Sequence, residues 1–181
     1  METLTLPYVV PDIRLATGYK AGIRPYREGG VRMEKTNEGN GKTVYHDYGH
    51  GGAGISIAYG CAKQVVEQLF LTEKVGKENE IAVLGAGIVG LTTAYLLIKQ
   101  GYKVNLYAEL TPFEQGKGKP EITTTVAAGY WMPLKVGNKS ETISQASETW
   151  WHYEDMRVLQ GKLGRNLGIT LLPAYAVNDD G

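Results

Sequence analysis

The sequence has a single cysteine, Cys61, so no disulfide can form within the chain. Cys61 falls in a predicted helix, where a cysteine is more often a small core residue than a nucleophile. We therefore predict that Cys61 packs in the core.

Long apolar runs and a net charge are also lacking. No run reaches the roughly 20 residues that a transmembrane helix needs, and the residues after Met1 do not resemble a signal peptide. The 19 Lys and Arg residues balance the 19 Asp and Glu residues, so no bulk field would attract nucleic acid or an anionic membrane. We expect a soluble cytoplasmic protein. A peroxisomal location stays open, although the sequence does not end in the peroxisomal tripeptide.

Glycine is in excess, with 24 residues in a chain of 181. The most informative cluster lies within 80–99, which reads as a buried strand, a glycine turn and an amphipathic helix. Gly85 allows a tight turn, Gly87 lets a pyrophosphate approach the backbone, and Gly90 lets the helix lie close to the strand. A phosphate would meet free N–H groups at the start of this helix. The alternative is a glycine-rich turn that binds nothing.

A second strand is predicted at 103–107, and the acidic residue Glu109 follows it. Glu109 lies roughly 20 residues beyond the glycines, where a carboxylate can accept hydrogen bonds from the ribose of an adenosine. Strand, turn, helix, strand and acid occur in the order of a nucleotide-binding unit. We therefore predict that this part of the chain binds a nucleotide.

A second glycine turn at 49–56 lies between a predicted strand at 43–48 and a predicted helix at 57–70. Before it, the pattern predicts a strand at 31–34 and a hairpin loop at 36–42. A turn of this kind also presents backbone N–H groups at a positive helix end. Two such turns can hold one long anionic ligand at two points.

Two charged side chains near this turn are candidates for function. Arg24 precedes Pro25, which favours an extended backbone, and its planar fork suits a carboxylate; a solvated loop arginine is the alternative. His50 has no acid or second histidine spaced to share a metal with it, so we predict a structural role for His50 and no metal site.

The remaining segments are assigned from composition. Residues 72–79 read as a linker. Residues 122–133 combine hydroxyl, small and aromatic side chains, typical of a surface against a planar ligand, although a strand entering a turn is the alternative. A helix is predicted at 144–159 and a strand at 168–175.

With these motifs in place, the chain resembles the D-amino acid oxidase family of flavoenzymes, in two blocks whose order is reversed. Residues from 81 to about 177 resemble the start of that family, through the motifs at 85–90, 107–109 and 123–133. Residues 18–70 resemble its end, through the motifs at 22–25 and 47–56. The resemblance implies an α/β fold: a Rossmann-like FAD-binding domain, similar to that of glutathione reductase, with a partial substrate-domain segment.

The resemblance also implies a division into four parts. These are a family C-terminal block at 1–71, a linker at 72–79, an FAD-binding βαβ core at 80–134 and a partial substrate-domain segment at 135–181. The middle of the family is missing, and with it much of the substrate domain. We expect a second polypeptide or another copy to supply or cover the gap; the alternative is that the chain is a fragment of a longer product.

The resemblance implies FAD as cofactor and oxidation of D-amino acids by hydride transfer to the flavin, with oxygen forming peroxide. Arg24 and Gly52 would be the catalytic residues, Arg24 by holding the substrate carboxylate. The implied cofactor-binding residues are Gly51, Gly54, Ile55, Ser56, Gly85, Ala86, Gly87, Ile88, Val89, Gly90, Glu109, Thr123, Thr124, Ala128, Gly129 and Tyr130. The alternatives are a non-catalytic flavin- or nucleotide-binding subunit that needs a partner chain, and an NAD-binding protein.

Overall fold

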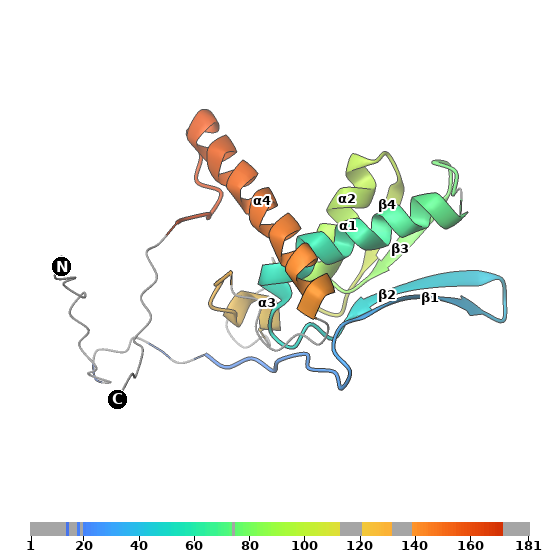
Figure 1. Cartoon of the computed structure of the whole chain (residues 1–181), viewed down its shortest axis with the longest axis horizontal. Helices are drawn as coiled ribbons and strands as arrows, with labels where there is room; N and C mark the ends of the chain where they lie inside the picture. Colours follow the sequence, from blue (N-terminus) through green and yellow to red (C-terminus); the bar gives the residue numbers. More distant parts are fainter. Residues whose placement is uncertain are drawn as a thin grey trace.

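The computed structural model describes residues 14, 18, 20–73, 75–112, 121–131 and 139–171. They form a mixed α/β arrangement with two small two-stranded sheets (Figure 1). The elements are β1 (Arg32–Glu38), β2 (Lys42–Tyr48), α1 (Gly54–Glu73), β3 (Glu80–Leu84), α2 (Ile88–Lys99), β4 (Lys103–Tyr107), α3 (Thr123–Val126) and α4 (Lys139–Leu163).

Strands β1 and β2 form an antiparallel hairpin that projects from the body of the molecule (Figure 1). The loop predicted at 36–42 is shorter than expected, because β1 continues to Glu38 and pairs there with Lys42. Polar side chains support this extension: Thr43 Oγ1 donates a hydrogen bond to Asn37 Oδ1 over 3.3 Å. Gly41 closes the turn with a φ of 77°, a conformation that suits glycine.

Strands β3 and β4 pair in parallel and α2 connects them, so the predicted strand–helix–strand unit is confirmed. The register pairs Glu80 with Lys103 and Leu84 with Tyr107. The carboxyl ends of both strands therefore meet at one edge of the sheet. The described residues place only these two strands in the sheet, which is narrower than the sheet expected of a Rossmann-like domain.

Helix α1 lies at the centre of the packing (Figure 1). One face packs against α2 and the parallel strands, in a core that includes Ala62, Val66 and Leu97. The opposite face buries Ile57 and Cys61 against Ala146 of α4. Cys61 has no exposed surface, so its predicted place in the core is confirmed.

Helix α4 crosses α1 at Gly60 and is longer than the helix predicted at 144–159. The Gly60 N–H donates a hydrogen bond to Thr149 Oγ1 over 3.0 Å, and this hydroxyl donates to the Gln145 carbonyl over 2.8 Å. A methyl group at Gly60 would collide with the backbone of Gln145. The close approach of the two helices therefore requires a glycine at this position.

A Gly60→Ala variant is expected to unfold with a free energy about 1 to 3 kcal/mol lower than the parent chain, because overpacking a tight contact costs about that much. Gly161→Ala is the matched control: Gly161 also lies in a helix, but a methyl group there meets no atom within 4 Å. This control should gain up to about 1 kcal/mol from helix propensity. Urea unfolding of both variants tests the crossing, and equal stabilities would contradict it.

Three other segments differ from the predictions. Residues 123–126 form the short helix α3, so the strand alternative there is wrong; the Thr125 N–H and hydroxyl both donate to the Ile122 carbonyl and favour a helical turn. Residues 168–171 are not a strand, and the rest of the strand predicted at 168–175 lies outside the described residues. The linker predicted at 72–79 begins inside α1, which runs through Glu73.

No helix of the described ranges is long and apolar enough to cross a membrane.

Candidate functional site

The two glycine turns adjoin each other. Gly54 begins α1, Ile88 begins α2, and a methyl group placed on Gly54 would lie 3.2 Å from Ile88 Cγ2. The N-terminal ends of both helices therefore meet, although Gly54 and Ile88 are 34 positions apart along the chain. Such ends carry partial positive charge and attract anions.

The first turn has the local geometry that its glycines predict. Gly85 has a φ of 109°, and its N–H donates to the Tyr107 carbonyl over 2.8 Å. A methyl group at Gly90 would collide with the Gly85 carbonyl oxygen, so α2 begins directly against the turn. Gly87 is the N-cap of α2 and contributes no side-chain cap. Glu109 is exposed two residues after Tyr107, at the same edge of the sheet.

Helix α3 lies against this turn. Thr124 Oγ1 accepts a hydrogen bond from the Ile88 N–H over 3.0 Å, and a methyl group on Gly87 would lie 3.3 Å from the same oxygen. The expectation that the N–H groups at this helix start are free is therefore wrong for Ile88. A phosphate bound here would have to share or replace the contact with Thr124.

The second turn is held by backbone hydrogen bonds. The Gly51 N–H donates to the Pro25 carbonyl over 3.1 Å, and the Ala53 N–H donates to the His50 carbonyl over 2.8 Å. Gly52 has a φ of 95°. These contacts attach the loop around Pro25 to the turn.

Arg24 lies directly on Gly52. A methyl group at Gly52 would collide with the Arg24 guanidinium, so the glycine makes room for this side chain. Behind Arg24, Thr123 Oγ1 donates to the Ile23 carbonyl over 2.9 Å, which holds the loop to α3. The cationic side chain remains exposed beside the second turn.

Two contacts complete the start of α1. The Ser56 hydroxyl donates to the Tyr130 carbonyl over 3.4 Å, and the Tyr153 hydroxyl of α4 donates to the Ile55 carbonyl over 2.7 Å. Burial raises the pKa of Tyr153 to about 12, so this phenol stays protonated at neutral pH and remains a donor. Gly129 has a φ of 74° and lies next to Tyr130, whose side chain is exposed.

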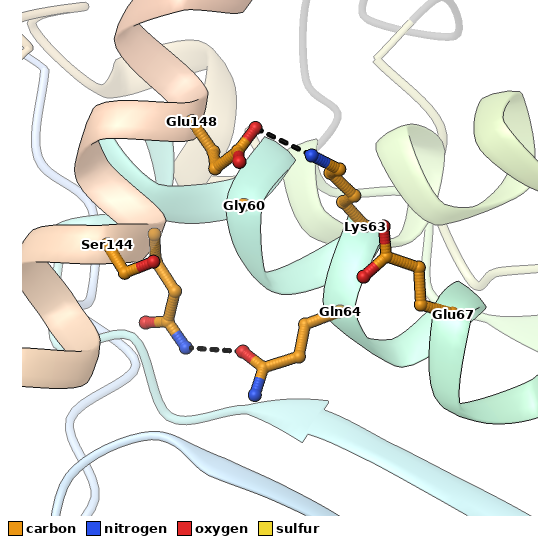
Figure 2. A pocket seen from close by; sticks show the side chains of 7 residues that line it. Gly60, Lys63, Gln64, Glu67, Ser144 and Glu148 are labelled. Atoms are coloured by element: carbon orange, nitrogen blue, oxygen red, sulfur yellow. Dashed lines mark hydrogen bonds and ion pairs between the residues drawn. The ribbon is translucent and has the colours of Figure 1, made fainter. Parts of the chain in front are cut away.

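The structure thus brings most of the sequence-predicted residues to one region, although their binding roles stay predictions. The contacts above connect the two turns, the Arg24 loop, α3 and the residues that follow it. A pocket of about 390 Å³ lies elsewhere, between α1 and α4 (Figure 2). Its rim includes an ion pair of Lys63 and Glu148 at 2.8 Å, and the hydrogen bond to Glu148 raises the pKa of Lys63.

Sequence reasoning missed Asp47. The expectation that no acid accompanies His50 is wrong, because Asp47 Oδ1 lies 3.2 Å from His50 Nε2 and both side chains are buried. The spacing of three positions was visible in the sequence. A spacing of three positions predicts a side-chain contact within a helix, but it predicts none at the end of a strand.

Curated relatives of the chain are D-amino-acid oxidases and a D-aspartate oxidase. The D-aspartate oxidase of Talaromyces thermophilus is 45% identical over 53 residues, which cover 29% of this chain and 14% of that protein. The D-amino-acid oxidase of Fusarium vanettenii is 42% identical over 77 residues, 38% of this chain and 20% of that protein. The D-amino acid oxidase of Dugesia ryukyuensis is 44% identical over 61 residues, 29% of this chain and 18% of that protein.

These matches support a relationship to the D-amino-acid oxidase family and, at family level, an oxidoreductase. The chain spans about a fifth or less of the length of these relatives. No family model and no solved structure matches it.

Proposed function

We propose that the chain binds FAD across its two glycine turns and takes part in oxidising D-amino acids. The observation that carries this proposal is the junction of the two helix N-termini at Gly54 and Ile88, with the Arg24 guanidinium beside it on Gly52. One long dianionic cofactor can occupy both positive helix ends. The names of the relatives supply the substrate class.

The residues present fit such a cofactor. The turn at 85–90 has the glycine-only surface that lets a pyrophosphate approach the backbone, and Glu109 is exposed where a ribose hydroxyl could donate to it. Residues 123–124 and 128–130 would line the path between the turns. The turn at 51–56 would contact the flavin ring, because Gly52 has no side chain of its own to keep a planar group from the turn.

When bound, FAD would supply the acceptor for the hydride from the substrate α-carbon. The chain would contribute positioning. Arg24 would hold the substrate carboxylate through two parallel N–H bonds and so fix the α-carbon over the second turn. The substrate ammonium would lose its proton to water and the α-carbon its hydride to the flavin, so this scheme needs no acid or base from the chain.

A contribution from further polypeptide is also proposed, on a specific observation. The face of the parallel sheet away from the helices exposes apolar surface: Leu84 is 79% exposed and Tyr107 is 57% exposed. Apolar sheet faces and open strand edges are normally covered. We propose that a second polypeptide, another copy or the rest of a longer chain covers this face, and that the family C-terminal block at 1–71 precedes the core at 80–134.

The purified chain is expected to bind one FAD per chain and to show a flavin absorbance spectrum. Peroxide release from a panel of D-amino acids distinguishes an enzyme from a binding subunit. It is measured with FAD, first with the chain alone and then with a second polypeptide that supplies the missing part of the substrate domain. FAD binding without peroxide in either assay would support the non-catalytic subunit. A chain that binds NAD and no flavin would overturn the proposal.

A further inference from the structure

Three metal-binding side chains meet in the interior, beneath the second glycine turn. Asp47 comes from β2, His50 from the turn and Cys61 from α1, and one ligand atom of each lies within 4.8 Å of the others. His50 is 3% exposed and Cys61 is fully buried. The Asp47 side chain is 8% exposed. An aspartate and a histidine so deep in a core need a compensating interaction.

The polar side-chain atoms of Asp47 and His50 Nε2 lack that compensation within the described part of the chain. Both carboxylate oxygens of Asp47 and Nε2 of His50 are buried and make no hydrogen bond there. The 3.2 Å approach of Asp47 Oδ1 to His50 Nε2 allows an ion pair if the imidazole is protonated, but it leaves Asp47 Oδ2 unsatisfied. A buried charge pair with unsatisfied atoms carries a large desolvation penalty.

We propose that Asp47, His50 and Cys61 bind a Zn²⁺ ion that joins the glycine turn to α1. Mixed oxygen, nitrogen and sulfur donors are typical of zinc, and three protein ligands leave one tetrahedral position for a water molecule. The ion would place a positive charge between the carboxylate, the imidazole nitrogen and the thiolate. It would satisfy the atoms of Asp47 and His50 that have no hydrogen-bond partner among the described residues.

The geometry suits a tetrahedral ion. Zinc–ligand bonds of about 2.0 to 2.3 Å place neighbouring nitrogen and oxygen ligands roughly 3.3 Å apart and oxygen and sulfur ligands roughly 3.6 Å apart. The observed separation of His50 Nε2 and Asp47 Oδ1 is 3.2 Å. The remaining ligand atoms, within 4.8 Å of each other, need to approach by at most about 1.2 Å to reach these separations.

The proposed ion would stabilise the turn from below. The His50 carbonyl accepts the Ala53 N–H, and His50 pairs with Tyr26 in a β-bridge. Gly51 and Gly52 follow His50 directly. A bond from the ion to His50 would therefore fix the position of the turn relative to Cys61 in α1. This inference does not depend on the proposed function, because metal binding is measured without flavin or substrate.

The test is metal binding by the full chain. Equilibrium dialysis is expected to give one Zn²⁺ per chain. Titration with Co²⁺ is expected to give a thiolate-to-metal charge-transfer band, which can arise only from Cys61 because the chain has no other cysteine. A wild-type chain that takes up no stoichiometric Zn²⁺, or that binds Co²⁺ without this band, overturns the proposal.

Two variants identify the ligands. Asp47→Asn keeps the shape of the side chain and removes its charge; we expect it to weaken Zn²⁺ binding more than the 10- to 100-fold caused by loss of an outer-shell contact. Cys61→Ser is expected to abolish the charge-transfer band. Asp155→Asn, at an exposed position of α4, is the matched control and should bind as the parent does. Binding of Zn²⁺ by Asp47→Asn at parental affinity would also refute the site.

Discussion

An Arg24→Ala variant is expected to lose substrate-dependent reduction of bound flavin by about 30- to 5,000-fold, because truncating one partner of a charge pair that bound FAD and substrate would desolvate costs about 2 to 5 kcal/mol. FAD binding is expected to remain. The guanidinium lies on Gly52 and forms no part of the first glycine turn. The measurement is anaerobic flavin reduction by a D-amino acid, followed by absorbance in whichever assembly shows activity.

Two further variants separate the role of Arg24 from a general charge effect. Arg24→Lys keeps the charge without the planar fork, so it should recover only part of the rate. Arg165→Ala removes an exposed arginine after α4 and should react as the parent does. Equal reduction rates for Arg24→Ala and Arg165→Ala would remove Arg24 from the proposed site.

The elements near the glycines could be predicted from the sequence because their determinants are local. The glycines at 85, 87 and 90 define a turn through their backbone freedom and lack of Cβ. The apolar residues that follow recur at helical spacing. The strand predicted at 103–107 has the same bounds in the structure as β4. Secondary structure of this kind needs no knowledge of distant parts of the chain.

The contacts that assemble the site could not be predicted, because they join residues far apart in sequence. Thr124 accepts the Ile88 N–H across 36 positions, and Thr123 donates to the Ile23 carbonyl across 100 positions. A hydroxyl pattern in the sequence identifies a polar surface and does not identify its partner. The threonines were assigned to a ligand, whereas the structure also uses them to hold two loops together.

The parallel sheet is narrower in the described residues than the sheet expected from the sequence. A Rossmann-like domain was expected, and a βαβ unit with two strands is what the described residues form. The local pattern of strand, glycine turn, helix and strand is satisfied by this unit alone. How many strands extend the sheet depends on other segments or chains, which would pair at the open edges of β3 and β4.

A Gly90→Ala variant is expected to lose FAD affinity, because the third glycine of such a turn lets the helix pack closely and so sets the position of the N–H groups that face a pyrophosphate. The added methyl group would collide with the Gly85 carbonyl oxygen, which is backbone and cannot rotate away. Helix α2 would therefore shift away from the turn. Overpacking of this contact should also lower the free energy of unfolding by about 1 to 3 kcal/mol. Fluorescence titration with FAD and urea unfolding measure the two effects.

A destabilising variant outside the turn shows whether lower stability alone weakens binding. Leu97→Ala removes a side chain from the core between α1 and α2 and should lower the free energy of unfolding by about 2 to 5 kcal/mol. The turn itself keeps its residues, so FAD affinity should stay near that of the parent under conditions where the variant is folded. If Leu97→Ala lost as much affinity as Gly90→Ala, loss of stability would account for both. If Gly90→Ala bound FAD as the parent does, the pyrophosphate would have to lie elsewhere, because no other contact in the first turn depends as directly on the absence of a side chain.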